Sequence, residues 1–94
     1  MNMFVDPMEC AQMIIEISLG KQCNPWAAAD EMKALGIFPL RVLLPHEAEY
    51  LSRITIYRSS QWSDVIGRLY RHGEEAGHEL TQLTLKELAK QAMN

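Results

Sequence analysis

Residues 6–36 read DPMECAQMIIEISLGKQCNPWAAADEMKALG and contain two helix starts of the same kind. At each start a side chain with a free oxygen, Asp6 or Asn24, precedes a proline. Such oxygens accept hydrogen bonds from the unpaired N–H groups of a helix N-terminus, and proline fits the first helical position because its missing N–H is not needed there. The pattern predicts a helix over 7–19 that ends near Gly20, and a second over 25–35 that is ended by Gly36.

The first of these predicted helices is apolar around almost its whole circumference. Glu9, Gln12 and Glu16 form one narrow polar stripe at helical spacing, and nearly all other positions are apolar. A helix of this kind is buried on more than one side. We therefore expect it to be the central element of the fold or part of a subunit interface, because it offers more apolar surface than a 94-residue monomer needs to bury.

Residues 37–44 are the ambiguous part of the chain. Apolar residues alternate there with others, which indicates an extended segment, while Pro39 disfavours a central strand. An apolar connector over the core is the first interpretation and a short edge strand is the second. Residues 53–58 are rich in β-formers, so a strand competes with a helix there. If 38–44 and 53–58 paired, the fold would be α+β with a small two-stranded sheet.

Three further helices are expected. One begins at Pro45, and another runs from Gln61 to His72 after a cap at Ser59 or Ser60. The last spans 85–93 and is marked by Thr84 and Glu87, which have the spacing of a capping box. The predicted fold class is thus all-α, a compact bundle of four to five short helices with the first helix central, in which residues 1–94 form a single domain.

Composition places few limits on function. The net charge of −3 is mild, and Cys10 and Cys23 are too few for a disulfide framework, which favours reduced thiols inside the cell. The first 19 residues carry three acids and no Lys or Arg, so they do not resemble a signal peptide. No apolar run approaches the ~20 residues of a membrane span. We expect a cytoplasmic protein that does not enter membranes.

Signatures of catalysis or metal binding are missing from the sequence. Cys10 lies in a helical first turn but within an apolar run, which is typical of a buried structural thiol. A polar cluster follows the fourth helix, but its spacing matches no established zinc pattern, and glycines interrupt it; it comprises His72, Glu74, Glu75, His78 and Glu79. We therefore predict no catalytic residue, no metal site, no cofactor and no enzymatic activity.

Arginines gather between residues 53 and 72, where Asp64 is the single acid. Arginine suits bidentate recognition of carboxylates and phosphates, and Gly67 would allow another backbone or a phosphate to approach closely. The other interpretation is a solvated helix face with an ordinary Asp64–Arg68 pair. The residues predicted to bind a partner are Arg53, Arg58, Gly67, Arg68, Arg71 and His72.

Two function hypotheses follow. The first is a small non-enzymatic cytoplasmic regulator, adaptor or inhibitor that acts by protein–protein interaction as a homodimer, because the first helix is too apolar for a lone monomer. The second is a nucleic-acid-binding regulator that uses Arg53, Arg58, Arg68 and Arg71, whose affinity would fall steeply with salt.

Overall fold

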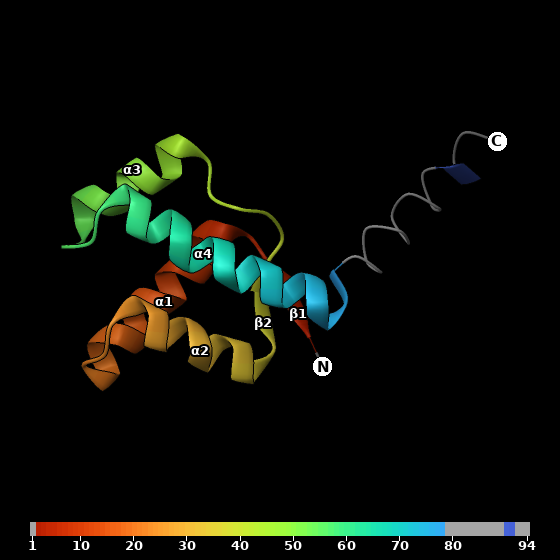
Figure 1. The fold of residues 1–94 in the computed structure, drawn as a ribbon, viewed down its shortest axis with the longest axis horizontal. Helices are drawn as coiled ribbons and strands as arrows, with labels where there is room; N and C mark the ends of the chain where they lie inside the picture. The colour runs from red at the N-terminus through yellow and green to blue at the C-terminus, as the bar shows by residue number, and fades with distance from the viewer. Residues whose placement is uncertain (1, 79–89, 92–94) are drawn as a thin grey trace.

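A computed structural model describes residues 2–78 and 90–91, and within them it contains four α-helices and two short strands (Figure 1). The predicted bundle of short helices is confirmed, with a small parallel sheet added to it. In chain order the elements are β1 (Met3–Val5), α1 (Pro7–Lys21), α2 (Pro25–Leu35), β2 (Ile37–Pro39), α3 (Pro45–Ile54), α4 (Ser59–Gly73) and a π-helical turn, η1 (Glu74–His78).

The first two helices begin as the sequence predicts. The Asp6 carboxylate accepts a hydrogen bond from the Met8 N–H at 2.9 Å, and Asn24 Oδ1 accepts one from the Ala27 N–H at 2.8 Å. At the end of α2, Gly36 adopts the left-handed conformation with φ 74°, and its N–H donates to the last turn of the helix. Sequence and structure therefore agree on where both helices start and where α2 stops.

The end of α1 differs from the prediction. Gly20 stays helical, the helix continues to Lys21, and Gln22 takes the left-handed position with φ 52°. The Cys23 N–H then donates to the Ser18 carbonyl at 3.1 Å. Because Asn24 already caps the next helix, the reversal between α1 and α2 has to be made at Gln22.

The sheet pairs different segments from those proposed for the α+β alternative. β1 and β2 run parallel, with Phe4 opposite Phe38 and Val5 opposite Pro39. Residues 53–58 do not form a strand: α3 continues to Ile54, and a bend follows. Pro39 is tolerated because it is the last residue of β2, and the Leu40 N–H closes the ladder onto Val5 O at 2.8 Å. Residues 40–44 form the expected connector.

In both α3 and α4, the side chain at the third helical position accepts a hydrogen bond from the backbone N–H of the residue that precedes the helix. Glu47 accepts from the Leu44 N–H at 2.9 Å, and Gln61 accepts from the Arg58 N–H at 2.7 Å. The cap predicted at Ser59 or Ser60 is therefore wrong, since α4 starts at Ser59 and Arg58 occupies the cap position. The predicted start of α3 at Pro45 is confirmed.

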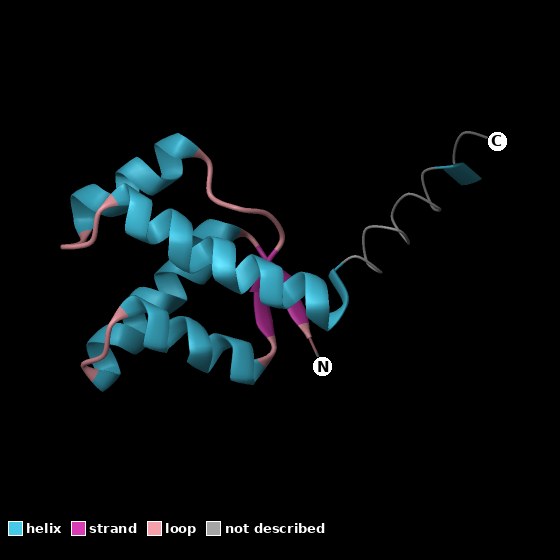
Figure 2. Ribbon diagram, in the orientation of Figure 1, coloured by secondary structure: helices cyan, strands magenta, loops and turns pink. Residues whose placement is uncertain are grey.

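The core is built around α4, which contacts α1, α2, α3 and β2. Figure 1 shows α4 crossing the molecule between α3 and the α1–α2 pair, and Figure 2 shows the two strands beside its C-terminal half. Helix α1 contributes Cys10, Ala11 and Ile14 to this core from one side, whereas α4 holds the central position predicted for the first helix. The largest buried side chains of α4 are Trp62, Val65, Ile66 and Leu69.

The predicted helix over 85–93, with its capping box at Thr84 and Glu87, lies outside the described residues except for residues 90 and 91, which are helical. Throughout the described part of the chain, each helix is too short or too polar to cross a bilayer.

Candidate functional site

An apolar groove runs along α1 on the side that faces α3. It consists of two adjoining hollows of about 330 and 370 Å3 that share Ile15 and Ile54 in their walls. The first hollow lies where the ends of several helices meet, and its other lining residues include Ser18, Leu19, Cys23, Ile56, Tyr57 and Trp62. The second lies between α1 and α3 and is also lined by Met8, Glu9, Gln12, Glu16, Tyr50 and Leu51. We call this continuous surface the α1–α3 groove.

The groove exists because α1 is apolar on more faces than the core can cover. Cys10 and Ile14 point into the core, whereas Ile15 and Leu19 lie about a quarter turn or more away on the groove side. Leu19 is 76% exposed, and across the groove Ile54 and Ile56 are 54% and 91% exposed. Large apolar side chains from three segments thus meet solvent on one surface.

Aromatic rings support the deeper wall of the first hollow. Tyr57 makes edge-to-face contacts with both Trp62 and Trp26, with ring centroids 6.4 and 6.3 Å apart. Trp62 Nε1 donates to Thr55 Oγ1 at 2.9 Å, which fixes the bend after α3. In the opposite wall, Ser18 Oγ is shielded from solvent and has no hydrogen-bond partner within the described chain. One wall of the hollow is thus formed by packed aromatic rings, and the other contains one buried hydroxyl without a partner among the described residues.

Charge is distributed unevenly around the groove. Glu9 and Glu16 are exposed along the α1 edge, and neither makes an ion pair with another described residue. Arg53 and Arg58 stand on either side of the 54–57 segment that lines the first hollow. One long edge of the groove is thus acidic, and an arginine precedes and another follows the lining segment 54–57 in the chain.

The six residues predicted to bind a partner divide between two places. Arg53 and Arg58 adjoin in the chain the segment 54–57 that lines the first hollow, although neither lines a hollow itself, and Arg53 is 3.9 Å from Glu49. Further along α4, Gly67 is open to solvent, with no atom within 4 Å of the position of an added Cβ. The prediction that these residues contact a partner stays a prediction.

Acidic neighbours limit the basic character of the α4 face. Arg68 lies 3.5 Å from Asp64, which also accepts a hydrogen bond from Trp26 at 2.8 Å. His72 Nδ1 is 3.6 Å from Glu75. Arg71 is exposed and forms no ion pair with the residues that the structure describes. A nucleic-acid phosphate would have to compete with these carboxylates for Arg68 and His72. The geometry therefore adds no support to the nucleic-acid alternative, which also stays a prediction.

Two glutamates of the polar cluster, Glu74 and Glu75, lie in the π-helical turn η1, which is kinked at Gly77 by a non-helical φ of 121°. Across residues 2–78 and 90–91, no three His, Cys, Asp or Glu side chains come together as metal ligands would. The side chain of His78 and all of Glu79 lie outside the described residues.

The Cys10 thiol is fully buried, and burial is the main reason that its pKa rises to about 12, with Asp6 and Glu9 adding to the effect. A thiol that stays protonated at neutral pH is a poor nucleophile. The sequence interpretation of Cys10 as a structural thiol fits this geometry.

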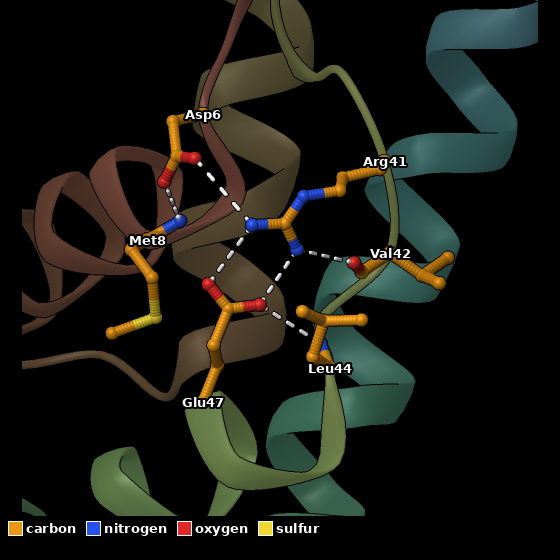
Figure 3. Close-up of polar contacts among 6 residues, drawn as sticks. All are labelled: Asp6, Met8, Arg41, Val42, Leu44 and Glu47. Carbon is orange, nitrogen blue, oxygen red and sulfur yellow. Dashed lines mark hydrogen bonds and ion pairs between the residues drawn. The ribbon is translucent and has the colours of Figure 1, made fainter.

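An ion-pair cluster that the sequence analysis missed ties three segments together (Figure 3). Arg41 binds the Glu47 carboxylate with two hydrogen bonds of 2.6 and 3.0 Å, and its guanidinium is 3.6 Å from Asp6. Hydrogen bonding from Arg41 is the main cause that lowers the pKa of Glu47 to about 2. The one sequence signal was Glu47 at the third position of α3, which suits a capping carboxylate.

Comparison of the chain with protein-family models, with curated proteins and with solved structures finds no match. The α1–α3 groove and its charges are therefore the basis for the functional proposal.

Proposed function

We propose that the protein is a small non-enzymatic cytoplasmic regulator or adaptor that binds another protein through the α1–α3 groove. The observation that carries this proposal is the exposure of Leu19, Ile54 and Ile56 around one hollow of about 330 Å3. Single exposed apolar side chains are common, but a continuous patch around a hollow is typical of an interaction site.

The energy available at this surface suits a protein interface. Full burial of a Leu or Ile side chain contributes about 1.5–3 kcal/mol, so covering the exposed parts of these three contributes roughly 3–7 kcal/mol before the cost of association. Arg53 and Arg58 at the edge would add polar contacts at the rim, where arginine is common in interfaces. A second copy of the chain is one candidate partner, since closed homodimers bury surfaces of this kind.

The proposal is tested by capture from a lysate of the cells that produce the protein. Three immobilised forms are compared: the unaltered chain, the double variant Leu19→Ser, Ile56→Ser, and the control Leu35→Ser. Leu35 is 63% exposed on α2 and lines neither hollow, so the control removes similar apolar area elsewhere. The same proteins are examined by sedimentation to detect dimers.

We expect a defined partner, or a dimer, with the unaltered chain and with Leu35→Ser, and its loss in the double variant. Because both groove residues are mostly exposed, the double variant keeps its fold, which circular dichroism checks. Equal capture by all three proteins, or a monomer that captures nothing, contradicts the proposal.

A further inference from the structure

We infer that the α1–α3 groove receives a basic amphipathic helix of a partner protein; this inference rests on the proposed function and names the chemistry of the partner. It follows from the shape of the groove, from the charges along its edge and from the charges at its end.

The shape of the groove fits a helix. The walls of the second hollow are side chains of two helices, α1 and α3, whose backbone groups are already bonded within the helices, so this part of the groove has no sheet edge for an extended peptide. The lining residues of α1 run from Met8 to Leu19, which is about three turns or roughly 16 Å. A partner helix of three to four turns with apolar residues on one face matches this length.

The negative charge along the α1 edge of the groove favours a basic partner. Glu9 and Glu16 lie two turns apart on the lining face of α1, with Gln12 between them. Several other carboxylates of the bundle lie beside an arginine, as Glu47 does beside Arg41, Glu49 beside Arg53 and Asp64 beside Arg68. Glu9 and Glu16 have no such neighbour among the described residues, so lysine or arginine on the partner helix would pair with them.

The end of the groove sets the direction of the partner helix. A helix carries partial positive charge at its N-terminus and partial negative charge at its C-terminus. Arg53 and Arg58 adjoin in the chain the segment 54–57 that lines the first hollow, whereas Glu9 lines the second, so the C-terminus is favoured at the first hollow and the N-terminus beside Glu9. The partner helix then runs parallel to α1, and one large apolar side chain near its C-terminal end enters the hollow beside Leu19 and Tyr57.

Two designed peptides test the inference. Both have 15 residues with leucine at helical spacing on one face; the remaining positions carry lysine in one peptide and glutamate in the other. Fluorescence anisotropy of the labelled peptides measures their affinity for the full chain. Two protein variants have equal changes in net charge: Glu9→Lys, Glu16→Lys in the groove, and Glu74→Lys, Glu75→Lys in η1 as the control.

We expect the lysine peptide to bind the unaltered chain at least tenfold more tightly than the glutamate peptide. The groove variant should reverse this order, whereas the η1 control should keep it, because only the groove variant changes charge beside the bound helix. Circular dichroism shows whether both variants keep the fold.

Equal affinity for both peptides, no binding of either, or an unchanged preference in the groove variant overturns the inference. So does a stable homodimer in which the groove is covered by a second copy and closed to peptides. That last result would leave the proposed function intact, whereas loss of all protein binding in the capture experiment would remove both.

Discussion

Gly73 lies where α4 passes β2, and its missing side chain is what lets these elements touch. A Cβ added at this position would be 2.8 Å from Phe38 Cβ and 3.4 Å from the Phe4 ring. Phe4 and Phe38 are opposite each other on the paired strands β1 and β2, and their ring centroids are 5.8 Å apart. The absence of a side chain at Gly73 is therefore required for packing.

We predict that Gly73→Ala destabilises the protein by about 1–3 kcal/mol, because the added methyl group forces the Phe38 backbone or the helix to move. Gly67→Ala is the matched control on the same helix. It meets no atom within 4 Å and should stabilise by about 0.5–1 kcal/mol through helix propensity. Urea unfolding followed by tryptophan fluorescence measures both changes. Changes of the same sign in the two variants would contradict the packing role of Gly73.

At the scale of elements, local signals predicted much of the fold. The Asp6 and Asn24 caps and the left-handed Gly36 depend on neighbouring residues only, so sequence reading placed them correctly. β1 was missed because a three-residue strand has no periodicity of its own and pairs with a segment more than 30 residues away. The Arg41–Glu47 pair was missed for a similar reason, since the connector brings Arg41 back over the start of α3.

The groove was predicted only in part. The apolar circumference of α1 indicated surface beyond the needs of the core, but not which side would stay uncovered. That depends on how far α3 stands from α1, which is a property of the tertiary structure. Arg53 and Arg58 were selected as binding residues from composition; they adjoin the lining segment 54–57 in the chain, and their role in binding stays a prediction.

The Arg41–Glu47 pair joins the connector to α3, and its contribution should depend on pH. The folded-state pKa of Glu47, about 2, lies below its ordinary value of 4.5, so the unfolded chain takes up the proton more readily. The stabilisation is then complete above pH 4.5 and is lost as the pH falls toward 2. We predict that Glu47→Gln costs about 1–3 kcal/mol at pH 7, the range for a hydrogen-bonded charge, and that this difference shrinks over that interval.

Thermal unfolding at a series of pH values checks this prediction, with Glu49→Gln as the control. Glu49 is exposed and 3.9 Å from Arg53, so its loss should change stability by less than about 1 kcal/mol. A Glu47→Gln variant as stable as the unaltered protein at pH 7 would show that the cluster in Figure 3 does not hold α3 in place.

At the scale of the whole molecule, one small core stabilises the bundle, and apolar side chains stay exposed to solvent around the α1–α3 groove. Helix α4 is covered by the other helices and β2, while α1 covers the core with one side and borders an open groove with another. Exposed Leu19, Ile54 and Ile56 line that groove together with Glu9 and Glu16, which make no ion pair among the described residues. This coincidence is why we propose a binding role.

Site-specific photocrosslinking in the cells that produce the protein tests this assignment most directly. A photoreactive amino acid replaces Ile56 in the groove or, as the control, Leu35 on α2, and irradiation joins it to whatever protein lies against it. If a partner protein binds the α1–α3 groove, we expect a discrete crosslinked band from position 56 and none from position 35. No adduct at position 56, or the same adducts at both positions, would contradict it.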